Sequence, residues 1–300
     1  MTSATKLAAF GVALAALFAG GAAAGGLLDA DAPGGDARAQ AQTTGHQAND
    51  SDGMKDMNDN NDNGHAAMTM PVRGLAVAEN DLRVEVDDPD LRRGRTEELR
   101  FRIVDEDGRA VRDFDVEHTK RMHLIVARRD LTGFQHLHPT MDADGTWKTP
   151  LRLPDAGSYR LFADFSHDEQ PTTLAADLRV DGTADLEPLP APAPTAKSDG
   201  GYDVRLDSGS ASAGSEAELR FEITKDGQPV HVEPYLGADG HLVALREGDL
   251  AFLHVHPSDH GDDDAVGFEA TFPTKGSYRL FLQFKHEGRV QTVAFTQEVK

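Results

Sequence analysis

The chain has no cysteine among its 300 residues. This absence excludes disulfide bonds, thiolate metal ligands, a cysteine nucleophile and a lipidated N-terminal cysteine. It also excludes a blue-copper electron-transfer centre, because that centre requires a thiolate ligand. Any metal site in this protein must therefore be built from other side chains.

Basic side chains are scarce. The 30 lysine and arginine residues are outnumbered by 51 aspartate and glutamate residues, and the formal net charge is −21. The excess of acid extends through the chain and is not confined to one tail. Such a chain is a poor partner for nucleic acid or for an anionic membrane surface. A cation is the partner that this charge favours.

Charged residues are missing from the run at residues 7–28, which follows Lys6 and precedes several acids. Its 22 residues are long enough to span a bilayer, so residues 1–28 are predicted to be a signal peptide or a membrane anchor. The basic residue before the run and the acids after it favour an N-terminus inside and a body outside. We therefore expect an extracytoplasmic protein, either secreted or anchored to the membrane by its N-terminal helix.

Aliphatic bulk is almost absent from residues 29–70, which are rich in Asp, Asn, Gly, Met and His. This composition predicts a disordered tether. It contains His46, His65, Met54, Met57, Met68 and Met70. Thioethers and imidazoles in an exported segment could capture copper, and the alternative is a polar linker that happens to contain them.

Convincing amphipathic helices are absent from the rest of the chain, which consists of short alternating apolar runs broken by turns. Leu-Arg-Phe-Arg-Ile at residues 99–103 and Leu-Arg-Phe-Glu-Ile at residues 219–223 each precede an Asp-Gly turn. Apolar residues with a period of two are typical of half-buried strands. The pattern predicts an all-β fold of antiparallel β-sandwiches.

The motif His-x-His-Pro occurs twice, at residues 136–139 and 254–257. In both copies another histidine stands thirteen residues before the motif, and a further one follows the downstream segment Gly-Ser-Tyr-Arg-Leu-Phe. The two halves therefore share four histidines in the same order. They are His123, His136, His138 and His167 in the first half, and His241, His254, His256 and His286 in the second.

This internal repeat predicts two domains. The first β-sandwich repeat is expected at residues 71–181 and the second at residues 202–300. Residues 182–201 separate them and contain four prolines in an alternating pattern, which indicates a stiff, extended linker.

The spacing of the histidines suggests that they meet. His136 and His138 project to the same face of a strand, because residues two apart share a face. A hairpin folded between the upstream histidine and the motif sets His123 opposite His138, within about 5 Å for cross-strand neighbours. His167 and His286 each end a core-facing row of their strand, at the rim of the sandwich. We therefore expect one four-histidine site in each repeat.

Imidazole is the commonest metal ligand near neutral pH, and clusters of three or four suit Cu(II), Zn(II) or Ni(II). Met122 is the one methionine on these strands, and it points away from His123, so a cupric ion fits better than a cuprous one. We predict a copper-binding protein for sequestration or delivery at the cell surface. A membrane copper transporter or another exported copper protein would be its partner.

Two alternatives remain. The histidines could instead form a structural hydrogen-bond network in a metal-independent interaction module at the cell surface. An enzyme is the less favoured alternative, because no carboxylate recurs beside the histidines in both halves and no nucleophile constellation is present. We therefore predict that the protein is not an enzyme.

The layout resembles that of a group of exported, heavy-metal-associated proteins of high-GC Gram-positive bacteria. The likeness is in the N-terminal segment, the tether, and the motifs around His123, around Asp130 to Pro139 and at Gly-Ser-Tyr-Arg-Leu-Phe. Each half resembles YtkA-type and CopC-type domains, which implies two tandem immunoglobulin-like sandwiches and extracytoplasmic copper handling. CopC proteins also use a histidine at the mature N-terminus, which has no counterpart here, so the CopC likeness concerns the fold.

Overall fold

The computed structural model describes residues 72–258 and 265–300, except the side chains of His254 and His256. The predicted N-terminal helix at residues 1–28 and the predicted tether at residues 29–70 lie outside these residues. All the regular elements within them are β-strands. None of the described residues belongs to a helix long and apolar enough to cross a membrane.

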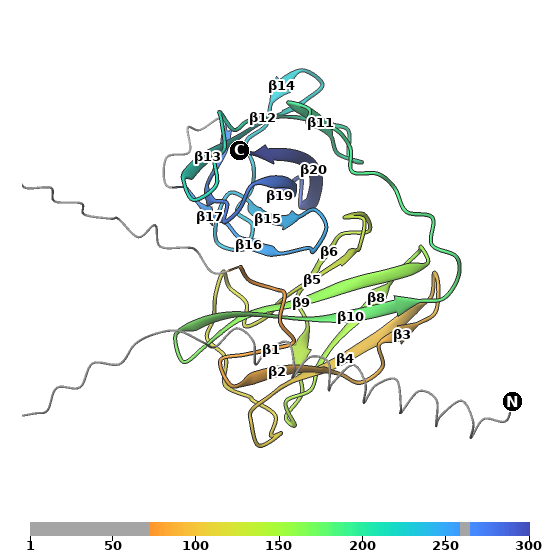
Figure 1. Cartoon of the computed structure of the whole chain (residues 1–300). Coiled ribbons are helices and arrows are strands. Elements are labelled where there is room, and N and C mark those ends of the chain that lie inside the picture. The colour runs from red at the N-terminus through yellow and green to blue at the C-terminus, as the bar shows by residue number, and fades with distance from the viewer. Residues whose placement is uncertain (1–71, 259–264) are drawn as a thin grey trace, which may run out of the picture. The chain divides into compact units, whose positions relative to one another are not determined.

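The first repeat is made of two facing sheets (Figure 1). The strand order in one sheet is β1 (Ala78–Glu79), β2 (Leu82–Val86), β4 (Thr96–Val104), β8 (Trp147–Arg152) and β7 (Thr140–Met141). The other has the order β3 (Asp90–Leu91), β10 (Gln170–Val180), β9 (Gly157–His167), β5 (His123–Arg128) and β6 (Gln135–Leu137). Neighbouring strands are antiparallel except for β3 and β10, which are parallel.

The second repeat has the same two-sheet plan. One sheet has the order β11 (Thr195–Lys197), β12 (Tyr202–Asp207), β13 (Glu216–Lys225), β18 (Ala265–Thr271) and β17 (His256–Pro257), with β14 (Gln228–Pro229) beside β13. The other has the order β16 (Phe252–His254), β15 (His241–Arg246), β19 (Gly276–His286) and β20 (Arg289–Val299). Because β11 pairs with β12, this repeat already begins inside the segment predicted as a linker.

Local sequence explains these elements. In β4 the apolar residues Leu99, Phe101 and Ile103 are buried, and the residues between them are more exposed, as an alternating strand requires. The Asp-Gly pair after β13 forms a two-residue turn in which Asp226 has φ 52° and Gly227 has φ 75°. Both values are positive, which a tight hairpin needs and which Asp and Gly tolerate. The prediction of an all-β fold with two tandem immunoglobulin-like sandwiches is confirmed.

The strands nearest the histidines are buried on both faces. Leu124 and Val126 of β5 belong to the core between the sheets of the first repeat. Ile125 and Ala127 point the other way and belong to a separate apolar cluster. This double burial accounts for the unbroken apolar run Leu-Ile-Val-Ala in β5, because a strand covered on one side would alternate with polar residues.

That separate cluster, which we term the joint, contains residues of both repeats. Its buried members are Ile125, Ala127, Leu131, Phe162, Ala175, Val243, Leu245, Leu250, Phe252 and Phe281. The rings of Phe134 and Phe281 are stacked across it, with their centroids 4.1 Å apart. The joint therefore ties the two repeats together by apolar packing in addition to the chain that connects them.

Replacing Phe281 with Ala removes a ring from the joint and leaves a cavity there. Losing a buried phenylalanine side chain costs about 3–5 kcal/mol. We expect calorimetry of the full chain to show one unfolding transition for the parent and two for Phe281→Ala, because the repeats lose their coupling. Val290→Ala, at a side chain that is 43% exposed on β20, is the control and should keep one transition. A single transition in Phe281→Ala would show that the coupling does not depend on this ring, and two transitions in the parent would contradict the coupling itself.

Candidate metal centre

The hairpin of β5 and β6 positions three histidines of the first repeat. Leu124 is paired with Leu137, and Ile125 with His136. The same register continued by one residue sets His123 opposite His138, and the centroids of these two rings are 5.1 Å apart. The register predicted from the sequence is therefore confirmed.

Strand parity directs these histidines toward the second repeat. His123 lies on the same face of β5 as Ile125, which belongs to the joint. In the second repeat, His241 lies on the same face of β15 as Val243, which also belongs to the joint. The two apolar faces pack together in the joint. His123 and His241, which begin β5 and β15 on these faces, are therefore brought together.

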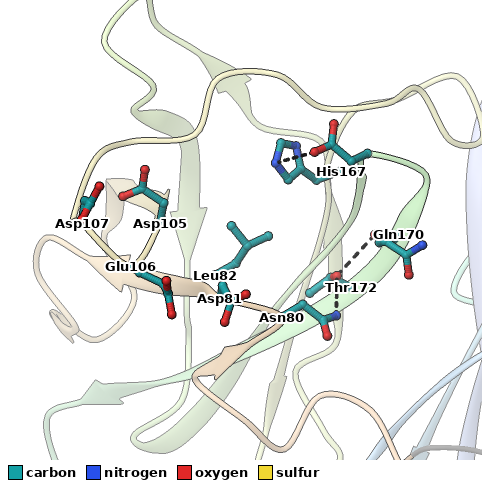
Figure 2. A pocket seen from close by; sticks show the side chains of 10 residues that line it. Asn80, Asp81, Leu82, Asp105, Glu106, Asp107, His167, Gln170 and Thr172 are labelled. Carbon is teal, nitrogen blue, oxygen red and sulfur yellow. Dashed lines mark hydrogen bonds and ion pairs between the residues drawn. The ribbon is translucent and has the colours of Figure 1, made fainter.

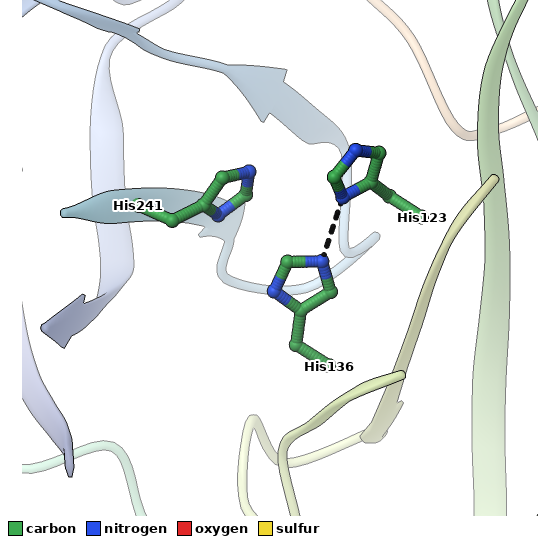
Figure 3. A group of neighbouring side chains, drawn as sticks. All are labelled: His123, His136 and His241. Atoms are coloured by element: carbon green, nitrogen blue, oxygen red, sulfur yellow. Dashed lines mark hydrogen bonds between the residues drawn. The ribbon is translucent and has the colours of Figure 1, made fainter. Parts of the chain in front are cut away.

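His123, His136 and His241 form one group (Figure 3). Each offers a nitrogen atom, and these three atoms lie within 4.8 Å of one another. The ring centroids of His136 and His241 are 4.6 Å apart, and the nearly parallel rings of His123 and His241 are 5.5 Å apart. The group therefore draws its donors from both repeats.

A hydrogen bond assigns the tautomer of one neutral ring in this group. His123 Nε2 lies 3.1 Å from the carbonyl oxygen of Glu117, which can only accept, so Nε2 carries the hydrogen and Nδ1 is the acceptor. On the other ring, His136 Nδ1 lies 2.7 Å from Gln283 Oε1. The Gln283 side chain is also hydrogen-bonded to Thr292 Oγ1 at 3.1 Å.

His123 Nδ1 and His136 Nε2 are only 3.0 Å apart, which is hydrogen-bond distance (Figure 3). A cation bound by both nitrogens would take the place of the proton between them. Two imidazoles that bind one ion at about 2.0–2.1 Å, at angles of about 90–110°, hold their nitrogens about 2.9–3.4 Å apart. The observed separation fits two neighbouring ligands of one metal ion.

Burial keeps these imidazoles neutral. Desolvation, together with the nearby His123 and His138, lowers the pKa of His136 to about 3. Desolvation, with His123 and Lys120 nearby, lowers the pKa of His138 to about 4. Neutral imidazole is the form that binds metals, so both rings are ready to act as ligands at neutral pH without first losing a proton.

His138 is a further donor beside the group. Its ring centroid is 4.7 Å from that of His136. Its Nε2 is buried and has no hydrogen-bond partner among the residues that the structure describes. A buried polar atom without a partner is unfavourable, and a bound cation would satisfy it.

His118 lies in a tight turn next to the group, with its ring centroid 6.1 Å from that of His123 and 6.0 Å from that of His241. The turn is closed by two backbone hydrogen bonds between Glu117 and Lys120. His118 has φ 46° and Thr119 has φ 69°, which is unusual for residues other than glycine. A similar turn in the second repeat approaches it, because a Cβ at Gly237 would lie 3.6 Å from Thr119 Cγ2.

The structure places His167 elsewhere. Its Nδ1 donates to the carbonyl oxygen of Asp113 at 2.8 Å, and its ring contacts Phe114. Figure 2 shows it at one side of a pocket that is also lined by Asp105 and Asp107. His286 is similarly apart, with its Nδ1 2.8 Å from the hydroxyl of Tyr202.

The expectation of one four-histidine site in each repeat therefore differs from the structure. On β9 the partner of His123 is Asp164, and His167 is three residues further on, so the two histidines project from opposite faces of the sheet. His286 and Gln283, the partner of His241, are related in the same way on β19. Parity within β9 places His167 in the core-facing row, whereas the register between β5 and β9 places His123 on the opposite face.

His254 and His256 are described only in their backbone. His254 is paired with Val243, the counterpart of the pair between His136 and Ile125, and His256 is paired with Glu269. Their side chains lie outside the described residues, so their part in a metal site stays a prediction.

Sequence reasoning missed Asp164 and Gln283. These two residues occupy matching positions, between Ala163 and Phe165 in one repeat and between Leu282 and Phe284 in the other. A polar residue at the same place in two otherwise apolar strands was a signal that it has a specific partner. Gln283 has that partner in His136.

These observations define a class of protein, namely a tandem β-sandwich whose repeats share a partly buried histidine cluster. The family described as "Domain of unknown function (DUF8832)" matches residues 76–182 and again residues 196–300. The chain belongs to this family and carries its domain twice. No curated protein matches the chain.

Several solved structures are similar to the chain. The adhesin FdeC of Escherichia coli is 16% identical, with 75% of this chain and 66% of that chain covered and a TM-score of 0.26. The adhesin InvE of Yersinia pseudotuberculosis is 11% identical, with coverage of 74% and 60% and a TM-score of 0.22. A chimeric titin Z1Z2 tandem is 15% identical, with coverage of 72% and 96% and a TM-score of 0.21. The chain spans less than two thirds of either adhesin, and similarity at this level concerns the fold alone.

The lowered pKa of His136 makes stability depend on pH. In the unfolded chain His136 has its ordinary pKa of 6.5, whereas in the folded chain its pKa is about 3. Between these two pH values only the unfolded chain binds the proton, so the free energy of unfolding decreases as the pH falls through this window. At pH 5 the loss from this one group is about 2 kcal/mol. We expect urea unfolding of metal-free protein to show that His136→Gln loses less stability than the parent between pH 7 and pH 5. His231→Gln, at an exposed histidine, is the control and should behave like the parent.

Equal losses in the parent and in His136→Gln would contradict the burial of a neutral imidazole at this position.

Proposed function

We propose that the protein binds a divalent transition-metal ion outside the cytoplasm, at a histidine site shared by the two repeats. His123, His136 and His241 are the ligands, and His138 is the neighbouring fourth donor. The observation that carries this proposal is the approach of His123 Nδ1 to His136 Nε2 at 3.0 Å, with a nitrogen of His241 in the same group of donors. A cation bound there would have imidazole ligands from both repeats.

Copper is the preferred ion. The donors are imidazole nitrogens, which suit Cu(II), Zn(II) and Ni(II), and Cu(II) is the ion that such sites bind most tightly. A cuprous ion would favour sulfur, but the side chain of Met122 is buried in the core of the first repeat. Zn(II) and Ni(II) are the alternatives to Cu(II).

Sequestration or delivery of the ion at the cell surface is the role that suits this site. Three imidazole ligands leave a fourth coordination position, which either His138 or a ligand from a donor or acceptor protein would take. A membrane copper transporter or another exported copper protein would supply or receive the ion. The acidic surface of the chain would raise the local concentration of cations.

A metal-independent interaction module is the second candidate. The hydrogen bond from His136 to Gln283 crosses from one repeat to the other without any ion. On this alternative the histidines only help to hold the repeats together, and the protein presents its sandwiches to another macromolecule at the cell surface.

Calorimetric titration of the metal-stripped full chain with Cu(II) and Zn(II) tests the proposal. We expect His136→Ala and His241→Ala each to weaken the tightest binding event at least tenfold, because each removes one ligand from the shared site. His167→Ala and His286→Ala are matched controls, since these histidines lie apart from the group, and both should bind like the parent.

Unchanged binding in His136→Ala and His241→Ala would contradict the shared site. No tight binding by the folded parent would favour the interaction module instead. Binding that depends on His167 and not on His241 would indicate a site formed within the first repeat alone.

A further inference from the structure

Asp164 and Gln283 form a matched pair beneath the histidine group. Asp164 on β9 is the register partner of His123, and Gln283 on β19 is the register partner of His241. Cross-strand partners hold their Cβ atoms about 5 Å apart. Each histidine that begins a central strand therefore has one of these two residues beside it.

Both residues are held by a threonine on the next strand. Thr173 Oγ1 donates to Asp164 Oδ1 at 2.7 Å, and Gln283 Nε2 donates to Thr292 Oγ1 at 3.1 Å. The two threonines are the register partners of the residues that they contact. In both repeats a threonine on the next strand thus holds the side chain at this position. The side chain is a carboxyl group in Asp164 and an uncharged amide in Gln283.

The Asp164 carboxyl group is buried, since the residue is only 7% exposed. As the register partner of His123, Asp164 lies on the same face of the sheet as that imidazole and beside the histidine group. A negative charge in a poorly solvated place interacts strongly with any cation that enters nearby.

We propose that Asp164 sets the charge preference of the histidine site, favouring a divalent over a monovalent cation without coordinating it. This inference rests on the proposed metal-binding function and adds a specificity-determining residue to it. The carboxylate is not among the donors that cluster within 4.8 Å of one another in the described part of the chain, so it acts on the ion through its charge and not as a ligand. The electrostatic attraction is proportional to the charge of the ion, so a divalent ion gains twice as much as a monovalent one.

The test uses the full chain, with Zn(II) as the divalent probe and Ag(I) as the monovalent probe. Asp164→Asn keeps an oxygen for Thr173 and removes only the charge. Residues that support metal ligands typically affect affinity 10–100-fold, and we expect a loss in this range for Zn(II). The loss for Ag(I) should be about the square root of that for Zn(II), because its charge is half as large.

Gln283→Glu is the reciprocal variant, which adds a carboxylate at the matched position of the other repeat. We expect it to tighten Zn(II) binding more than Ag(I) binding. It also keeps the inference testable if Asp164→Asn does not fold. Urea unfolding of the metal-free proteins separates this effect from a structural role, because a structural role for Asp164 would lower the free energy of unfolding of Asp164→Asn. Asp164→Asn should keep the stability of the parent, because the amide oxygen can still accept the hydrogen bond from Thr173.

The inference fails if Asp164→Asn binds Zn(II) like the parent, or if Zn(II) and Ag(I) lose affinity by the same factor. It also fails if the loss of affinity is matched by a loss of stability in the metal-free protein. Failure of the proposed function is distinct from these outcomes, since in that case the parent itself binds no Zn(II).

Discussion

The packing of one apolar sheet face against another is the constraint on which the site depends. Strands β5 and β15 bury their inner faces in their own sandwiches, and their outer faces carry Ile125 and Val243 into the joint. An apolar face of this kind must be covered, and in this protein the two repeats cover each other. His123 and His241 stand at the ends of these rows, so covering the apolar residues also brings the histidines together.

The joint also explains the chemistry of the histidines. Apolar packing excludes water, which penalises a charged imidazolium and keeps His136 neutral. The carbonyl oxygen of Glu117 contacts His123, and the amide of Gln283 contacts His136, so both rings are held in place. The result is a group of three imidazoles with nitrogens within 4.8 Å of one another, which could hold a metal ion. The arrangement depends on both repeats, because Gln283 and His241 come from the second.

The fold and one hairpin were accessible from the sequence, because both depend on local patterns. Alternation in residues 99–103 and 219–223 indicates strands, and the spacing from His123 to His138 sets their register. The sharing of the site was not accessible, since nothing in a strand's alternation says which other face will cover it. His167 was misplaced for a different reason. Its core-facing parity was recognised correctly, but its face was not compared with that of His123 across the sheet.

Anomalous diffraction from crystals of the full chain grown with Zn(II) tests the central claim most directly. The account predicts an ion about 2.0–2.1 Å from imidazole nitrogens of both repeats, with His136 and His241 among its ligands. An ion bound only by histidines of one repeat, or bound at His167 or His286, would contradict the shared site. Crystals in which these histidines keep their hydrogen bonds and bind no ion would contradict the metal-binding function itself.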